Sequence, residues 1–160
     1  MDYHMRRHDR ELIEADRIEA VLRTGRFATF ALTDGTEPYV VTLSYGYDEK
    51  ESRLYFHVAH EGQKLDFIRR NPRVCGTIVV AGDYLQGECA HPYESVIVRG
   101  EMRIVSEGEE KRHALRTLVE HLEDDPAAYW EKRSLDDTSR LTSFTALCFE
   151  IEQMTAKAGS

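Results

Sequence analysis

Residues 57 to 64, HVAHEGQK, contain the side chains best suited to chemistry. An imidazole titrates near neutral pH, so it can move a proton or ligate a metal ion. His60 and Glu61 could begin an HExxH zinc motif, but that motif needs a second histidine where this chain has Lys64. The sequence therefore excludes a zinc site of this type.

Gly62 and Lys64 are compatible with the binding of a small anion such as a phosphate. Residues 64 to 70 are predicted to form a short helix, closed by Asn71 and Pro72. A glycine lets backbone N–H groups approach a phosphate, and the following helix directs its positive end toward that group. Because a solvated lysine in the first helical turn is slightly disfavoured, Lys64 is better explained as a ligand of the anion.

Other candidates are weaker. Cys89 and His91 could join His57 or His60 around a metal, but a semi-buried thiol and a surface histidine are the favoured interpretation. His57 shares a strand face with Tyr55, so a histidine of the sheet wall is as good an explanation as a functional one. No Walker, dinucleotide-binding or nucleophile-elbow motif is present.

Composition limits the class of protein. A length of 160 residues fits one domain, here taken as residues 1–160, and a net charge of −8 argues against nucleic acid as a partner. No apolar run reaches the length of a membrane helix, and the first residues lack the apolar core of a signal peptide. Three widely spaced cysteines, Cys75, Cys89 and Cys148, fit reduced thiols. We expect a cytoplasmic protein that does not bind membranes.

Hydrophobic periodicity predicts a mainly β domain with flanking helices. In residues 38–47 a bulky face containing Val41, Leu43 and Tyr45 alternates with a face of smaller side chains. Hairpin-length connections and the lack of β-α alternation favour a six-stranded antiparallel barrel over a doubly wound sheet. We expect six strands, at 26–33, 38–47, 53–59, 74–81, 93–106 (bent at Gly100) and 143–151. Helices are expected at 9–23, 64–70 and 107–123. Residues 152–160 are expected to be a tail, and no element is assigned to 124–140.

Three blocks of the chain resemble a known family in the family's order: EPYVVTLSYGYD (37–48), LYFHVAHEGQKLDFIRRNPRV (54–74) and YESVIVRGEMRIV (93–105). They are similar to the pyridoxamine 5′-phosphate oxidase-like family, in particular its 5-nitroimidazole-resistance (nitroimidazole reductase-like) branch. The resemblance implies a split β-barrel that binds FMN. It also implies a homodimer with the cofactor between the subunits.

The resemblance also implies a set of site residues. The FMN phosphate would be held by a strand, a tight loop and a short helix; the isoalloxazine ring would lie along a second strand; and a polar side chain would reach the cofactor from the start of the long strand. His57 would lie near the ring as a proton donor or a hydrogen-bonding group. In the same order, the matching residues are Phe56, His57, Val58, Glu61, Gly62, Gln63 and Lys64; Val41, Thr42 and Leu43; and Ser95.

Two departures from the family narrow the function. The chain lacks the arginine-rich C-terminal substrate segment of true pyridoxamine phosphate oxidases, which argues against vitamin B6 oxidation, and it has Gly62-Gln63-Lys64 in place of Ser-Arg-Lys. We expect an FMN-dependent reductase or oxidase of a small planar organic substrate, with nitroaromatic compounds as one class. The alternatives are a flavin- or haem-binding sensor or storage protein, and a protein that uses a deazaflavin.

Overall fold

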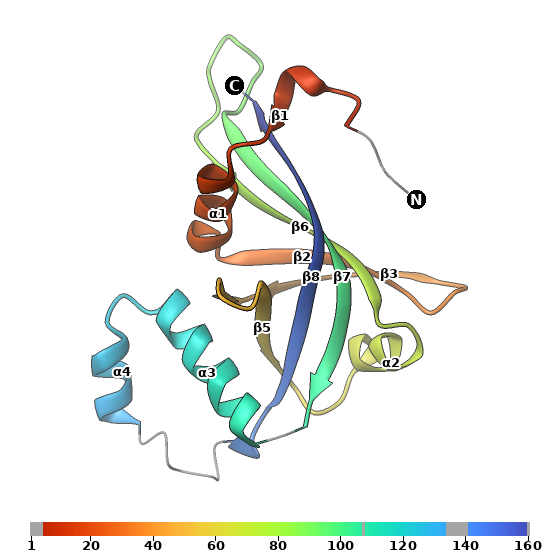
Figure 1. Cartoon of the computed structure of the whole chain (residues 1–160), viewed down its shortest axis with the longest axis vertical. Helices are drawn as coiled ribbons and strands as arrows, with labels where there is room; N and C mark the ends of the chain where they lie inside the picture. Colours follow the sequence, from red (N-terminus) through yellow and green to blue (C-terminus); the bar gives the residue numbers. More distant parts are fainter. Residues whose placement is uncertain (1–4, 107, 134–140, 160) are drawn as a thin grey trace.

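The computed structural model describes residues 5–106, 108–133 and 141–159. Within these residues one antiparallel sheet is flanked by helices (Figure 1). The elements are a 3-10 turn at His8–Arg10, β1 Glu11–Leu12, α1 Ala15–Thr24, β2 Phe27–Thr33, β3 Pro38–Ser44, β4 Gly46–Asp48, β5 Arg53–Val58, α2 Gln63–Arg70, β6 Arg73–Ala81, β7 Tyr93–Val105, α3 Gly108–Leu122, α4 Pro126–Lys132 and β8 Thr145–Gly159.

The sheet curls into a half-barrel. Its strand order is β3-β2-β6-β7-β8-β5-β4, and β1 pairs with β8 outside this path. The two ends of the path, β3 and β4, are consecutive in the chain and are separated by Tyr45 alone. The ends of the sheet are therefore joined through the backbone, as a split barrel requires, and the predicted fold class is confirmed.

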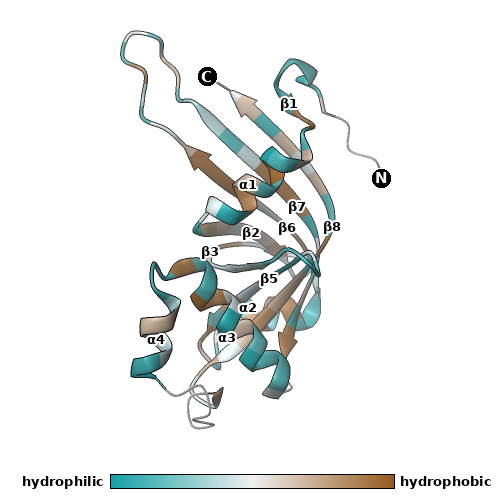
Figure 2. Cartoon of the chain, turned by 60° about the vertical axis from the view of Figure 1, so that its left-hand side comes forward, coloured by the Kyte–Doolittle hydropathy of each residue, from teal (hydrophilic) through white to brown (hydrophobic). Residues whose placement is uncertain are grey.

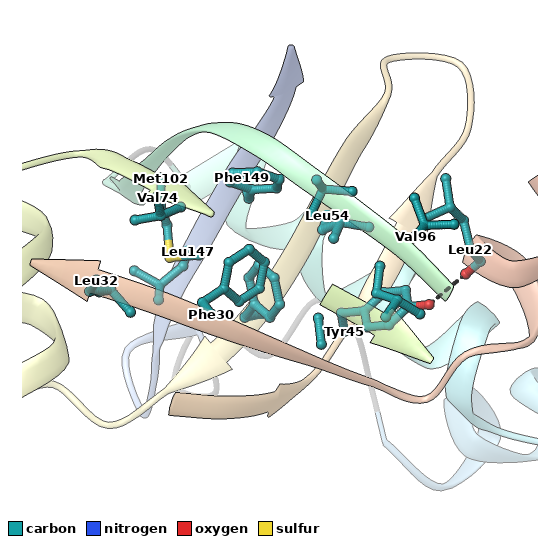
Figure 3. Close-up of a cluster of buried hydrophobic side chains, with 14 of the residues drawn as sticks. Leu22, Phe30, Leu32, Tyr45, Leu54, Val74, Val96, Met102, Leu147 and Phe149 are labelled. Atoms are coloured by element: carbon teal, nitrogen blue, oxygen red, sulfur yellow. Dashed lines mark hydrogen bonds between the residues drawn. The ribbon is translucent and has the colours of Figure 1, made fainter. Parts of the chain in front are cut away.

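Two details of the strand prediction differ. The expected strand 38–47 is divided at Tyr45, because this side chain is fully buried and its hydroxyl donates a 2.7 Å hydrogen bond to the Leu22 carbonyl (Figure 3). The expected helix 9–23 begins only at Ala15. Residues before it form β1, in which Leu12 is buried opposite Ala156. The described residues thus form eight strands in place of the six expected.

The tail expected at 152–160 is wrong, since β8 continues to Gly159. Its second half pairs with β7 from Tyr93 to Arg99, and its first half pairs with β7 from Gly100 to Val105, with a register shift between Arg99 and Gly100. The residues of this segment are small and polar, so no apolar pattern in the sequence indicates a strand. Backbone pairing with β7 holds the segment in place instead.

The core lies inside the curl of the sheet. Phe30 from β2 packs edge-on against Phe149, with the ring centroids 5.0 Å apart (Figure 3). It packs in the same way against Phe56, with the centroids 5.5 Å apart. Such aromatic contacts add to the stabilisation from apolar burial. α1 and α2 bury their apolar residues in the same cluster and so close the ends of the half-barrel.

α3 covers the outside of β4 and β5. On its first turns, Glu110 accepts a 2.9 Å hydrogen bond from Arg103, and at its other end Arg26 donates a 2.6 Å hydrogen bond to the Leu122 carbonyl. Burial lowers the pKa of His121, whose Nε2 lies 2.7 Å from the Gly25 carbonyl oxygen.

No helix of the described ranges is long and apolar enough to cross a membrane.

Gly100 provides a test of the bend in β7. A Cβ at this position would lie 1.8 Å from the Glu150 carbonyl oxygen, whereas a Cβ at Gly108 would meet nothing within 4 Å. Gly100→Ala should therefore lower the free energy of unfolding by about 3 kcal/mol, measured by urea denaturation. Gly108→Ala is the control and should leave stability nearly unchanged. Equal stability of the two variants would contradict the close approach of β7 and β8.

Candidate functional site

The barrel is open between β3 and β5. β4 pairs with β5 only as far as Gly46 opposite Tyr55. Continued pairing would place Ser44 opposite His57, but among the described strands β3 pairs only with β2, and β5 beyond Tyr55 pairs only with β8. Residues 41–44 and 56–58, here called the open edges, thus have backbone N–H and C=O groups without a strand partner on one side. Such groups can bind the polar rim of a ligand.

Because side chains alternate between the two faces of a strand, those near the open edges differ in whether they can face a ligand. Val41 and Leu43 pack against the hydrophobic core, and Phe56 and Val58 belong to it. The side chains of Phe56 and Val58 are buried, and those of Val41 and Leu43 are partly buried, so the backbone of these four residues offers most of the polar groups to a ligand. Thr42, which is exposed, points the other way, and its hydroxyl lies 2.9 Å from that of Thr29.

His57 is exposed on the outer side of β5. Its ring meets that of Phe144 edge-on, with the centroids 6.4 Å apart, and it has no hydrogen-bond partner among the described residues. His57 thus lies on the wall of the sheet, as one of the two interpretations expected, but it lacks the hydrogen bond that a purely structural histidine would form. A free imidazole beside an aromatic ring is available for binding or proton transfer.

The loop after β5 leads directly into α2. Gly62 has φ +139°, a conformation that L-residues rarely adopt, and its carbonyl accepts a 2.9 Å hydrogen bond from Leu65 N–H. His60 anchors the loop, with Nδ1 3.0 Å from the Thr145 hydroxyl. Glu61 and Gln63 are exposed. The glycine thus turns the chain so that the first N–H groups of α2 stay open.

Lys64 stands at this helix start. It is half-buried and has no hydrogen-bond or ion-pair partner among the described residues. Its ammonium group lies near Gly62, 3.9 Å from where a Cβ of that residue would be. An unpaired cation beside open N–H groups fits an anionic ligand, since helix dipole and ammonium charge act in the same direction.

Not every residue of the predicted site lies near the open edges and the start of α2. Ser95 pairs with Lys157 on β8, whereas His57 pairs with Ala146 on the same strand. Eleven residues of β8 separate these positions, about 36 Å along a strand at the usual rise. In one chain Ser95 therefore lies far from the loop at residues 59–62.

The two arginines at the end of α2 are also engaged elsewhere. Arg69 donates a 3.0 Å hydrogen bond to Asp66, and Arg70 donates a 2.9 Å hydrogen bond to Asp34. Hydrogen bonds from Thr36 and Glu37 N–H groups hold the pKa of the Asp34 carboxyl well below its ordinary value. Both arginines are thus paired with carboxylates, and they lie at the far end of the helix from Lys64.

Outside the predicted set, the site includes Phe144 and Thr145. Both come from the start of β8 or just before it, nearly ninety residues after His57, and the pairing of β5 with β8 brings them close. No local sequence signal could reveal them. Within the described residues, no group of three or more His, Cys, Asp or Glu is placed to hold a metal ion.

Comparison with known proteins decides the family. A family model described as pyridoxamine 5′-phosphate oxidase matches residues 14–158, nearly the whole chain. The chain belongs to the pyridoxamine 5′-phosphate oxidase family. The resemblance inferred from sequence is thus confirmed, and the half-barrel with its open edges is this family's fold.

Solved structures of family members and neighbours agree. A candidate 5-nitroimidazole antibiotic resistance protein from Bacteroides thetaiotaomicron is 26% identical, with a TM-score of 0.75 and coverage of 98% of this chain and 96% of that one. An FAD-binding protein from Mesorhizobium loti is 24% identical (TM-score 0.65, coverage 92% and 96%). An FAD and heme binding protein from Mycobacterium smegmatis is 18% identical (TM-score 0.76, coverage 94% and 74%). The last two likenesses concern the fold alone.

Proposed function

We propose that this pyridoxamine 5′-phosphate oxidase family protein binds FMN at the open edges and uses it in an oxidoreductase reaction. The observation that carries the proposal is Lys64, a half-buried cation without an ionic partner among the described residues, beside Gly62 at the start of α2. A phosphate there would accept hydrogen bonds from the open N–H groups and neutralise the ammonium charge. Glu61 and Gln63 complete the loop around it.

The ring of the flavin would lie against the open edges. Backbone groups of Val41 and Leu43 would bind its polar rim, while the partly buried side chains of these residues pack on the core and fix the position of the strand. Phe56 and Val58 hold the β5 edge in the same way. Thr42 offers a hydroxyl on the outer face, and Ser95 could reach this cofactor only from a second subunit, given its place on β7.

His57 is proposed as the catalytic residue. A bound flavin supplies hydride or electron transfer, so the protein must position the substrate and manage protons. The exposed, unbonded imidazole of His57 can donate a proton to a reduced product or form a hydrogen bond to the flavin. Small planar organic compounds are the proposed substrates, and the similarity to the Bacteroides protein favours nitroaromatic ones.

A second candidate function is a non-catalytic flavin- or haem-binding protein. The feature in its favour is again the free imidazole of His57, which could serve as an axial ligand of haem iron. An absorbance spectrum after addition of each cofactor separates the two functions, because haem gives a Soret band and flavin does not.

We also propose a homodimer that pairs through the outer face of β2, β3 and β6. Phe27, Val40 and Val79 are 61%, 64% and 52% exposed there, and Figure 2 shows the hydrophobic end of β6. The helices that contact these strands, α1 and α2, bury their apolar residues on the opposite face. An uncovered apolar sheet face of this kind is typical of a subunit interface.

Replacement of Lys64 tests the phosphate position. Lys64→Ala should weaken FMN binding by about 1.5 to 3 kcal/mol, the range for a hydrogen bond to a charged group, in a titration followed by flavin fluorescence. Lys50→Ala, in an exposed turn, removes the same charge and should leave the affinity unchanged. An FMN affinity unaltered by Lys64→Ala would place the phosphate elsewhere.

Replacement of His57 tests the catalytic role. His57→Phe should still bind FMN but should slow reduction of a nitroimidazole by the dithionite-reduced protein by about a hundredfold, as expected for loss of a general acid. His91→Phe, which removes an exposed imidazole on the loop between β6 and β7, is the control in the same stopped-flow assay. Equal rates for wild type and His57→Phe would exclude His57 from catalysis.

A charge on the apolar face tests the dimer. The wild-type protein should have twice the mass of the 18.5 kDa chain by light scattering, and Val79→Glu should dissociate it because burial of an unpaired carboxylate is costly. Ile13→Glu places the same charge at a position that is 78% exposed but lies off this face, and it should remain a dimer. A monomeric wild type, or a dimeric Val79→Glu, would refute this interface.

A further inference from the structure

The orientation of the His57 ring depends on packing, because this ring has no hydrogen-bond partner among the described residues. On the outer face of the sheet His57 lies directly opposite Ala146 of β8. Phe144 comes two residues before Ala146 and is therefore the diagonal neighbour of His57 on the same face. The short side chain of Ala146 leaves the space between them open. The imidazole and phenyl rings meet there edge-on, with their centroids 6.4 Å apart.

Phe144 is itself fixed by packing. Its side chain is partly buried and lies against a small apolar cluster between the sheet and α3. Movement of the phenyl ring away from His57 would open this cluster, and protein interiors lose many favourable contacts when a gap of that kind forms. The buried members of the cluster are Tyr55, Val105, Ala114, Ala146 and Cys148.

Lys111 holds the same ring from the side of α3, which contacts β8 (Figure 1). The Lys111 ammonium group lies 5.1 Å from the centroid of the Phe144 ring, within the range of a cation–π contact. It also donates a 2.6 Å hydrogen bond to the Leu141 carbonyl. No carboxylate in the described part of the chain pairs with this lysine, so the phenyl ring and the carbonyl fix the position of its charge.

We propose that Phe144 is a positioning residue for His57 and that Lys111 keeps Phe144 in this position. The inference rests on the proposed function, in which His57 gives one proton to the substrate during reduction and, being exposed, regains one from solvent. Proton transfer requires a donor within hydrogen-bonding distance and in the correct direction, so a freely rotating imidazole is a poor acid. Contact with a fixed ring limits this rotation without occupying either nitrogen of His57.

A purely structural role for these residues predicts different behaviour. If Phe144 only filled the apolar cluster, leucine would replace it with little effect on His57, because leucine is also apolar. If Lys111 only joined α3 to the Leu141 carbonyl, its removal would lower stability without a change at His57. The surroundings of the His57 ring therefore distinguish a positioning role from a structural one.

NMR of the histidine ring C–H groups, combined with the stopped-flow assay of nitroimidazole reduction, tests the inference in the FMN-saturated protein. The His57 signal is the one that disappears in His57→Phe. Phe144→Leu should shift this signal, because the ring current of the phenyl group is lost. It should also slow reduction at saturating substrate by at least about tenfold, since a small displacement of a reacting group can cost about a hundredfold. The affinities for FMN and for the substrate should stay as in wild type.

Conservative variants separate position from packing. Phe144→Tyr keeps the ring, and Lys111→Arg keeps a cation that can lie over it, so both should retain the His57 signal and the rate. Lys111→Met should shift the His57 signal in the same direction as Phe144→Leu and should also slow reduction. Lys132→Met removes the same charge at an exposed position of α4 and is the matched control, which should behave as wild type.

Other results would overturn the inference. An unmoved His57 signal in Phe144→Leu would do so, as would a wild-type rate for this variant while His57→Phe is slow. Loss of FMN affinity in Phe144→Leu would assign the ring to the cofactor, and weaker substrate binding with an unchanged maximal rate would make it a substrate contact. Equal rates for wild type and His57→Phe would instead refute the proposed function itself, whatever happens to the His57 signal in the Phe144 variants.

Discussion

The burial of Tyr45 determines the shape of this molecule. Its side chain points into the core at the junction of β3 and β4, and its hydroxyl donates a hydrogen bond to the Leu22 carbonyl near the end of α1. A strand that would otherwise run straight is thereby broken, so β4 remains paired with β5 while β3 follows β2. The open edges, and with them the candidate flavin site, exist because pairing stops at this residue.

The alternation of side chains made much of this architecture predictable. The bulky face of residues 38–47 is the face that packs on the core, and the hairpin between the strands predicted at 26–33 and 38–47 and the bend at Gly100 are where the sequence indicated. The tail was missed because residues 152–159 carry few apolar side chains; pairing with β7 holds them. α4 was also missed, although Asp125 before Pro126 is a typical helix start, with its carboxylate accepting a hydrogen bond from Ala128 N–H.

The sequence predicted only the part of the candidate site whose residues are close together in the chain. His57 to Lys64 forms one strand end, loop and helix start, so residue types and spacing sufficed. The rest depends on strand register: Phe144 and Thr145 reach this segment through β8, and Ser95 does not reach it within one chain.

The most direct test of the account is a crystal structure of the protein reconstituted with FMN. The account predicts a flavin ring against residues 41–44 and 56–58, with the phosphate within hydrogen-bonding distance of Lys64 and the first N–H groups of α2. Two results would contradict it: a flavin bound at another surface with the loop at residues 61–64 empty, or β3 and β5 hydrogen-bonded directly to each other so that no ring can enter between them.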